Sequence, residues 1–326
     1  MQRHLLFRIA AQYFPVQVHT PAEYDPSRQY VLSCHPHGII GISLVLSVAL
    51  DPLRIREKLG IDWQLGTVTP NFMLPLWREL LMAAGLIEVS RESIDYVLGQ
   101  GRNVAIVVGG AREALDADGR MAEERLTLAK RKGFIRMALR HGADVIPVYS
   151  FGERSLFNQV VAGEDAWLRR FQMWTMRILR FSLPVFFGRG VWQYRFGLLP
   201  HRVPLHVVFG PAVRMPHIPE PTQADIDEAH KRYVIALAKL YYQWQPKVLQ
   251  LWAEAQTQTS RALPSVPVPL QLDDEELDAE VQQACQADSL PKQAAATQAE
   301  SNSPAPASEA SRPARPSPRR RAVVED

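Results

Sequence analysis

The segment VLSCHPHGIIG, at residues 31–41, places two histidines two positions apart at the end of an apolar run. An imidazole with a pKa of about 6.5 takes up a proton near neutral pH, so His35 or His37 suits the role of a general base. Pro36 fixes its own φ and holds His35 in an extended conformation. Gly38 lacks a side chain beside His37 and lets a ligand approach the backbone. The segment therefore predicts a site built around a positioned imidazole.

A glycine pair and a carboxylate follow a second apolar run, VAIVVGGAREAL at residues 104–115. Gly109 and Gly110 predict a turn where the backbone comes close to a ligand, and Glu113 falls in the first turn of the following helix. A carboxylate that accepts an imidazole N–H fixes the tautomer of the ring and raises the basicity of its other nitrogen. We expect Glu113 to reach one of the two histidines from a neighbouring strand end.

Four basic residues suit an anionic, phosphate-bearing ligand: Arg78, Arg112, Arg131 and Lys132. Such ligands favour arginine or lysine near helix starts and strand ends. Arg78 stands out because it follows Trp77 on an apolar helical face, where an unpaired buried cation would be costly. The sequence thus predicts a partner or a ligand for its guanidinium.

The elements that must position these residues alternate between strands and helices. Short runs rich in Val and Ile, bounded by Gly or Pro, predict buried strands at residues 30–34, 104–110, 143–151 and 203–210. Helical patterns occupy residues 74–85, 94–99, 125–141 and 224–253. This alternation predicts an α/β fold with a mixed, mostly parallel central sheet flanked by helices. Ligands bind outside the carboxyl ends of strands in such sheets, and the two histidines fall at such an end.

Composition narrows the class of protein. The chain has 326 residues, 47% of them hydrophobic, which is enough to bury a large core. Its formal charge of +3 is small, and the basic residues of the folded part are scattered among acidic ones, which argues against a nucleic-acid surface. Cys34 and Cys285 are the only cysteines, so neither a disulfide framework nor a four-ligand zinc site is expected.

The composition changes at about residue 256, beyond which Ala, Gln, Ser and Pro dominate. We expect a folded domain at residues 1–255 and a disordered tail at residues 256–326, within which residues 272–285 have the pattern of one acidic helix. The longest apolar run, IIGISLVLSVAL at residues 39–50, is shorter than the ~20 residues that a spanning helix needs. No transmembrane helix is predicted.

Taken in order, the motifs resemble those of the type-2 diacylglycerol acyltransferase family, which includes monoacylglycerol and wax-ester acyltransferases. Matching segments run through nearly all of the predicted domain: YFP at 13–15, HPHG at 35–38, PLWR at 75–78, GGAREAL at 109–115, RKGFIRMALRHGADVIPVYSFGE at 131–153, LPVFFGRG at 183–190 and VPLHVVFGPAV at 203–213. Several motifs in the right order are more specific than any one of them. The resemblance implies a glycerolipid-acyltransferase-like fold.

The resemblance also implies an O-acyltransferase that moves an acyl group from acyl-CoA to the hydroxyl of a neutral lipid, most simply turning diacylglycerol into triacylglycerol. One histidine would take the hydroxyl proton. We favour His37 as this base, with His35 as its support and Glu113 orienting it. Related glycerolipid acyltransferases carry an Asp five residues beyond the His, but Ile40 and Ile42 stand there in this chain, so Glu113 would replace that Asp. The resemblance implies no metal and no redox cofactor.

Substrate-binding residues are expected around this base, and acyl-CoA is the expected co-substrate. The candidates are Arg78, Gly38, Gly109, Gly110, Arg112, Arg131 and Lys132. Family members usually carry a hydrophobic hairpin ahead of the YFP block, whereas twelve residues precede that block here. We therefore expect peripheral attachment to a membrane or lipid droplet on the cytosolic side, at the endoplasmic reticulum if the source is eukaryotic. Apolar surface at residues 39–50, 166–181 and the aromatic-rich 241–252 suits the headgroup interface.

Other interpretations stay open at the level of sequence. A metal-dependent hydrolase also begins with His-x-His after a first strand, but it needs further ligands at later strand ends, where His206 is the main candidate. A cysteine hydrolase would pair Cys34 with His35, although adjacent residues of a strand point to opposite faces. A catalytically silent lipid-binding protein would keep an apolar groove and need neither histidine.

Overall fold

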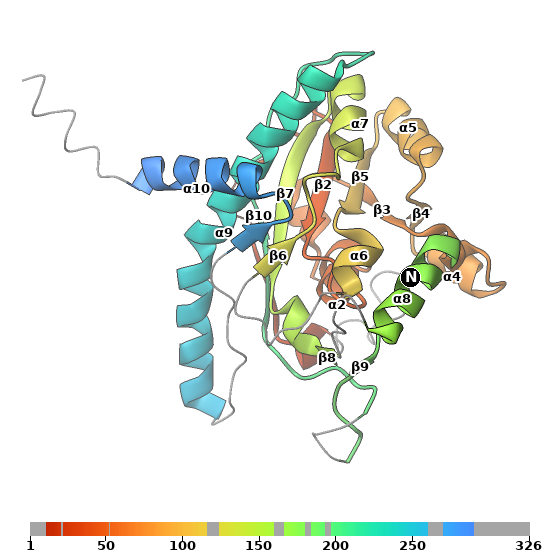
Figure 1. Cartoon of the computed structure of the whole chain (residues 1–326), viewed down its shortest axis with the longest axis vertical. Coiled ribbons are helices and arrows are strands. Elements are labelled where there is room, and N and C mark those ends of the chain that lie inside the picture. Colours follow the sequence, from red (N-terminus) through yellow and green to blue (C-terminus); the bar gives the residue numbers. More distant parts are fainter. Residues whose placement is uncertain are drawn as a thin grey trace, which may run out of the picture. The chain divides into compact units, whose positions relative to one another are not determined.

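A seven-stranded sheet forms the centre of the computed structural model, which describes residues 11–20, 22–51, 53–115, 124–159, 166–179, 184–192, 197–259 and 270–289 (Figure 1). The strand order is β1 (Val16–His19), β10 (Leu205–Phe209), β7 (Asp144–Phe151), β2 (Tyr30–His35), β5 (Asn103–Val107), β3 (Trp63–Thr67) and β4 (Ile87–Glu88). Neighbours run parallel except for the antiparallel pair β10–β7. The predicted mixed, mostly parallel sheet is confirmed.

Helices cover both faces of this sheet. They include α2 (Ile42–Leu44), which continues as the π-helix η1 (Val45–Ala49), and α3 (Ile55–Leu59), α4 (Trp77–Ala83), α5 (Arg91–Gly99), α6 (Gly110–Leu115), α7 (Gly133–His141), α8 (Trp167–Leu179), α9 (Gln223–Thr259) and α10 (Glu275–Ser289). Short 3₁₀ turns occupy η2 (Thr69–Phe72) and η3 (Glu153–Leu156). Among the described helices, none is both long and apolar enough to cross a membrane.

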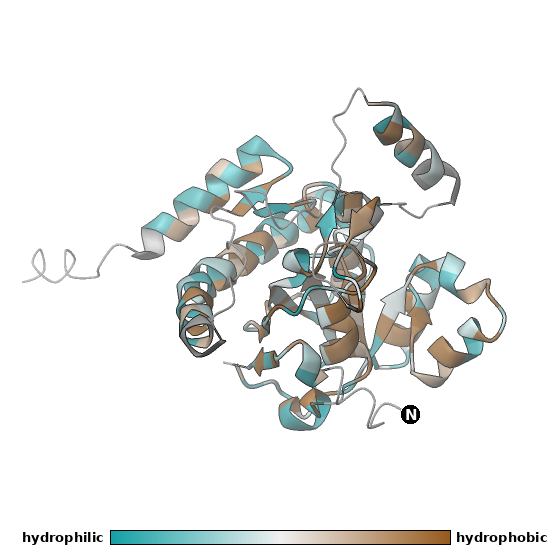
Figure 2. Ribbon diagram, turned by 90° about the horizontal axis from the view of Figure 1, so that it is seen from below, coloured by the Kyte–Doolittle hydropathy of each residue, from teal (hydrophilic) through white to brown (hydrophobic). Residues whose placement is uncertain are grey.

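The central strands are buried on both faces because both receive helices. Every residue of β2, β7 and β10 is buried, and the hydropathy colouring of Figure 2 shows the apolar character of the sheet. Val31 belongs to the cluster under α5, α7 and α9, whereas Leu32 belongs to the cluster with α2 and α3. Successive residues of a strand face opposite ways. His35, four residues after Val31, therefore points towards the α7 and α9 side.

The boundary predicted at residue 256 differs from the structure, in which residues 270–289 are ordered and the acidic helix expected at residues 272–285 forms as α10. Strand β11 (Leu270–Leu272) pairs in parallel with β6 (Glu124–Leu126), and α10 follows it. Leu277, Val281 and Cys285 recur at intervals of four and give this acidic helix an apolar side. The compact unit accordingly extends to residue 285. Residues 290–326 lie outside the described part of the chain.

Strand β6 also corrects the helix predicted over residues 125–141, because only its second part forms α7. Two further short strands, β8 (Asn158–Gln159) and β9 (Phe186–Phe187), form an antiparallel pair of their own. The sheet nevertheless sets the geometry of the site. Strands β5, β2 and β7 are parallel neighbours, so the segments that follow them emerge at one edge.

Candidate active site

The segments after β5, β2 and β7 bring side chains of three motifs to one place. Glu113 comes from α6 after β5, His37 from the turn after β2, and Glu153 from η3 after β7. The turn after β2 uses Gly38 and Gly41 at φ of 60° and 77°, values that favour glycine. The turn leads directly into α2, so His35 ends a buried strand and His37 lies between that strand and α2.

His35 is sealed in the interior. It is fully buried, and its Nε2 lies 2.8 Å from the hydroxyl oxygen of Tyr233 on α9, which also bonds the Ser33 hydroxyl. Burial lowers the pKa of His35 to about 3, because a charged ring would lose its hydration without gaining a countercharge. The ring is therefore neutral at physiological pH. Its Nδ1 has no hydrogen-bond partner among the described residues.

His37 lies two residues further on and is only half-buried. Its Nδ1 is 3.0 Å from the carbonyl oxygen of Gly38. With the proton on Nδ1, the ring donates to this carbonyl and keeps its Nε2 lone pair for another proton. The two histidines of the motif thus have separate environments, and His37 is the more accessible one.

Glu113 holds His37 by its main chain. Its Oε1 accepts a 2.7 Å hydrogen bond from the backbone N–H of His37, and its Oε2 accepts a 3.2 Å bond from the N–H of Thr127. The carboxylate is only 1% exposed. The sequence predicted contact between Glu113 and a histidine, and the structure brings the two together. However, the predicted hydrogen bond to the imidazole is replaced by one to the backbone, because the carboxylate folds back over the glycine turn.

The glycines of the turn make room for these contacts. A Cβ at Gly109 would overlap Oε2 of Glu113, so only glycine leaves space for the carboxylate there. Gly110 has φ of 68°, and a Cβ on it would lie 3.3 Å from Nη2 of Arg131. A Cβ at Gly38 would lie 2.6 Å from Cγ of Glu153. All three glycines therefore face side chains of the site in this structure.

The predicted basic residues do not all gather here. Arg131 is exposed and places its guanidinium beside Gly110, whereas Lys132 bonds Asp227 on α9 at 2.8 Å. The side chain of Arg112 lies outside the described part of the chain.

The expectation that Arg78 is embedded in an apolar face is wrong. Its side chain is 55% exposed and lies 3.4 Å from Glu79. None of the residues of α4 is buried, because this helix presents its apolar side chains to the surface instead of packing them inward.

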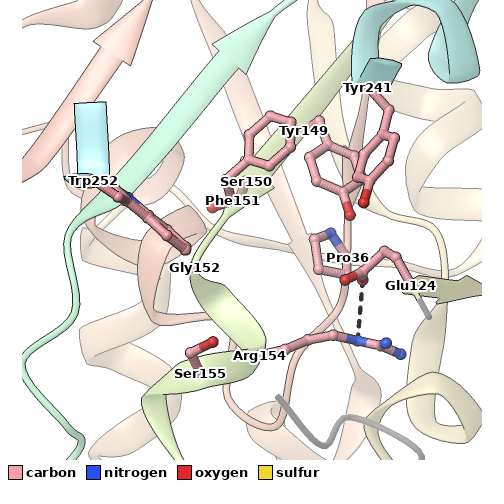
Figure 3. Close-up of a pocket in the computed structure, with 10 residues that line it drawn as sticks. All are labelled: Pro36, Glu124, Tyr149, Ser150, Phe151, Gly152, Arg154, Ser155, Tyr241 and Trp252. Carbon is pink, nitrogen blue, oxygen red and sulfur yellow. Dashed lines mark ion pairs between the residues drawn. The ribbon is translucent and has the colours of Figure 1, made fainter. Parts of the chain in front are cut away.

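Sequence reasoning missed a buried ion pair beside the histidine turn. Glu124 and Arg154 lie 3.1 Å apart with side chains only 6% and 3% exposed. Burial raises the pKa of Glu124, and the charge of Arg154 opposes that rise. Figure 3 shows the hydroxyls of Tyr149 and Tyr241 turned towards Glu124. An acid at the start of a short strand and an arginine after FGE were the only signals, and neither is specific.

These residues line a small cavity next to Pro36. Its walls are formed by Pro36, Glu124, Tyr149, Ser150, Phe151, Gly152, Arg154, Ser155, Tyr241 and Trp252 (Figure 3). The cavity measures about 20 Å³, enough for one water molecule and far too small for an acyl chain. It is polar on one side and aromatic on the other, and it lies directly behind the histidine turn.

The family model described as "Diacylglycerol acyltransferase" matches residues 1–251, a stretch that includes His35, His37, Glu113 and Glu153. The chain belongs to the diacylglycerol acyltransferase family. Membership makes the protein an acyltransferase and confirms the resemblance drawn from its motifs. The segment of β11 and α10 lies beyond the residues that this family model matches.

Individual relatives agree with the assignment. The chain is 39% identical over 244 residues to diacylglycerol O-acyltransferase 2 of Dictyostelium discoideum, covering 74% of this chain and 73% of that one. It is 38% identical over 241 residues to the Homo sapiens protein of the same name, covering 72% and 62%. It is 38% identical over 240 residues to 2-acylglycerol O-acyltransferase 1 of Bos taurus, covering 72% and 71%.

Among solved structures, the acyltransferase PlsC of Thermotoga maritima aligns over 72% of this chain and 76% of that one, with a TM-score of 0.40 and 10% identity. This likeness is too distant to carry weight.

Proposed function

We propose that this protein transfers an acyl group from acyl-CoA to the free hydroxyl of a diacylglycerol, giving triacylglycerol and coenzyme A. Relatives named for diacylglycerol and 2-acylglycerol acylation support a glyceride acceptor. The observation that carries the mechanism is the position of His37, an accessible imidazole at the carboxyl end of β2 whose backbone is held by a buried carboxylate.

In the proposed reaction, Nε2 of His37 takes the proton from the acceptor hydroxyl while the hydroxyl oxygen attacks the thioester carbonyl. The carbon–sulfur bond then breaks, and the imidazolium of His37 returns the proton to the departing thiolate, so that coenzyme A leaves as the thiol and the neutral ring is restored. No covalent intermediate with the enzyme, metal or redox cofactor is required. His35 supports the turn from inside because its buried neutral ring is bonded to Tyr233.

Glu113 acts in this proposal as a positioning residue, since both its oxygens accept backbone N–H bonds. Arg131 is a candidate for binding the phosphates of the acyl donor, because it is exposed beside Gly110. A guanidinium binds phosphate oxygens in a bidentate manner.

A metal-dependent hydrolase receives no support from the residues in place. His206, the expected further ligand, lies 3.1 Å from His19 and is buried between β1 and α9 side chains. Within the described ranges, no group of three His, Cys, Asp or Glu residues is arranged to hold a metal ion.

The decisive experiment is incubation of the purified protein with labelled acyl-CoA and a panel of alcohols that includes diacylglycerol, monoacylglycerol and a long-chain alcohol. We expect labelled triacylglycerol from the wild type, and a rate lower by about 100- to 10,000-fold for His37→Ala. An exposed histidine away from the site, His217, provides the control, since His217→Ala should keep the wild-type rate. Equal rates for His37→Ala and the wild type would contradict the mechanism.

We also propose that α8 attaches the protein to a phospholipid surface. Its outward side carries Trp167, Phe171 and Trp174, which are 74%, 47% and 57% exposed, whereas the polar Gln172 and Thr175 are buried. A helix on a water-facing surface has its polar residues outward and its apolar residues inward, and α8 has the reverse arrangement. In Figure 2, α8 shows apolar and polar residues around one helix.

The charged residues of α8 indicate the kind of lipid surface that its outward side would bind. The thirteen residues of α8 include three arginines and no acidic residue, and Arg170 is exposed between the aromatic side chains. Trp and Phe beside a cation suit the boundary between anionic or zwitterionic headgroups and acyl chains. The lipid acceptor of the proposed reaction would be found at the same boundary.

A further inference from the structure

Glu153 is a buried acid that the proposed mechanism has not used. It follows β7 in η3 and is only 3% exposed. Its Oε1 accepts a 2.9 Å hydrogen bond from the N–H of Ile42, and its Oε2 accepts a 2.8 Å bond from the N–H of Ser43. These are the first two residues of α2, the helix that begins directly after the histidine turn. One side chain from η3, the turn after β7, therefore fixes the end of the histidine turn.

The same side chain packs against the beginning of the turn. A Cβ at Gly38 would lie 2.6 Å from Cγ and 2.7 Å from Oε1 of Glu153, so the acid lies against the residue that follows His37. The Ser150 hydroxyl of β7 adds a 2.6 Å bond to Oγ of Ser43. The turn between β2 and α2 is thus held at both ends by residues of β7 and of η3, which follows it.

Hydrogen bonds from neighbouring groups stabilise the charged form of the Glu153 carboxylate. Burial raises the pKa of Glu153, while the bonds from Ser43 and Ile42 and the nearby charge of His37 lower it. Both of its oxygens are engaged by backbone donors, so the group is not available as a base. It differs in this respect from a catalytic acid, which needs an oxygen turned towards its substrate.

We propose that Glu153 is a positioning residue for the acyl transfer, which fixes the turn from Gly38 to Ser43 and so holds His37 at the place where the acceptor hydroxyl arrives. The inference rests on the proposed role of His37 as the base. Together with Glu113, which holds the backbone of His37 from the β5 side, Glu153 clamps the turn from the β7 side. A base displaced by about 1 Å loses about 100-fold in rate.

The test compares Glu153→Gln with Asp144→Asn. Asp144 is the matched control because it is also buried and lies at the far end of β7, the strand that precedes Glu153. It accepts a 3.0 Å hydrogen bond from the backbone N–H of Met215 and forms ion pairs with Arg28 at 2.7 Å and Arg214 at 3.1 Å. An amide at position 153 turns a donor towards one of the two N–H groups and breaks that bond. We expect kcat to fall about 10- to 100-fold with KM within about twofold.

Asp144→Asn is expected to lower the melting temperature but to keep the wild-type kcat per folded molecule. If Glu153→Gln keeps the wild-type kcat, or loses activity only in proportion to its folded fraction as Asp144→Asn does, the proposal is overturned. Should Glu153→Gln not fold, Gly38→Ala addresses the same contact, because its Cβ displaces the carboxylate. A wild type without any acyltransferase activity on the alcohol panel would refute the proposed function itself, a result distinct from an active Glu153→Gln.

Discussion

At the residue scale, the two histidines of the motif have different surroundings although only one residue separates them. His35 is buried and bonded to Tyr233, whereas His37 lies on the turn and is only half-buried. The sequence alone left open which of them is the base. The alternation of side chains along a strand predicts the face of the sheet on which His35 lies. It does not predict how completely α9 buries the ring. The division of roles between the rings therefore became visible only with the position of Tyr233.

We predict that His35→Ala acts on stability more than on chemistry. Loss of the ring opens a hole in the core and leaves the Tyr233 hydroxyl with one partner fewer, which should cost about 2–4 kcal/mol in the free energy of unfolding. Chemical denaturation measures this loss, and kcat per folded molecule should change far less than in His37→Ala. A stable His35→Ala protein with no activity would instead make His35 a catalytic residue.

We predict that Gly109→Ala reproduces the effect of Glu113→Gln. The added Cβ overlaps Oε2 of Glu113, so the carboxylate must leave the N–H of His37, as it does in part when it becomes an amide. Both variants should lose about 10- to 100-fold in kcat. Gly133→Ala is the matched control, because a Cβ there meets nothing within 4 Å. A Gly109→Ala enzyme as fast as Gly133→Ala would show that this contact is dispensable.

At the scale of elements, the sequence predicted well the parts that local pattern determines. The Val- and Ile-rich runs became β2, β5, β7 and β10, and the long helical pattern became α9. The sequence-based prediction failed where the segments that pair are far apart along the chain. Residues 124–126 form a strand only because residues 270–272 come to lie beside them, and neither segment carries that information by itself. The contact of Glu153 with α2 was missed for the same reason, since 110 residues separate the acid from Ser43.

The β11 and α10 segment supports the site from outside the family match. Asp273 Oδ1 accepts hydrogen bonds from the N–H groups of Leu128 at 2.7 Å and Ala129 at 2.8 Å, next to Thr127, which in turn bonds Glu113.

Val281 on α10 is 1% exposed, so Val281→Ala should cost about 1–2 kcal/mol in the free energy of unfolding. Gln283→Ala, an exposed change on the same helix, should cost nothing measurable. Equal stability of the two variants would show that α10 does not belong to the cooperative unit.

We predict that the outward aromatic side of α8 controls binding to vesicles. Trp174→Ala should lower the partition coefficient onto phosphatidylcholine vesicles that contain phosphatidylserine by about 5- to 30-fold, the factor that 1–2 kcal/mol represents. Co-sedimentation measures the bound fraction. Tyr96 on α5 is 67% exposed and serves as the control, because Tyr96→Ala removes an aromatic ring from a different element. An effect of Trp174→Ala on oligomeric state without an effect on vesicle binding would assign this side to a protein partner.

At the scale of the whole molecule, the site depends on one edge of the sheet. Three adjacent parallel strands deliver Glu113, His37 and Glu153 in turn, and their registry sets the spacing of these residues more firmly than any loop would. The buried groups behind this edge also make the fold sensitive to acid. Burial lowers the pKa of His206 and His230 to about 4 and that of His35 to about 3.

We predict that the protein loses stability as the pH falls below about 6.5. The unfolded chain binds a proton at each of these histidines near that pH, whereas the folded chain does so only near pH 4 for His206 and His230, and near pH 3 for His35. Between those values each histidine removes up to about 1.4 kcal/mol of stability per pH unit. Burial raises the pKa values of Glu124 and Glu153, which opposes part of this loss because the folded chain then takes up protons first. Urea denaturation at pH 7, 6 and 5 measures the slope.

The variant His206→Asn separates this cause from general acid sensitivity. It removes one of the buried titrating rings, so the loss of stability between pH 6 and pH 5 should become shallower by about 1 kcal/mol per pH unit relative to the wild type. His19 also has a pKa lowered by burial and contacts His206, so its own contribution should change in the same variant. His217→Asn, at an exposed position, should leave the slope as it is. Identical slopes for His206→Asn and the wild type would mean that buried histidines do not set the acid limit of the fold.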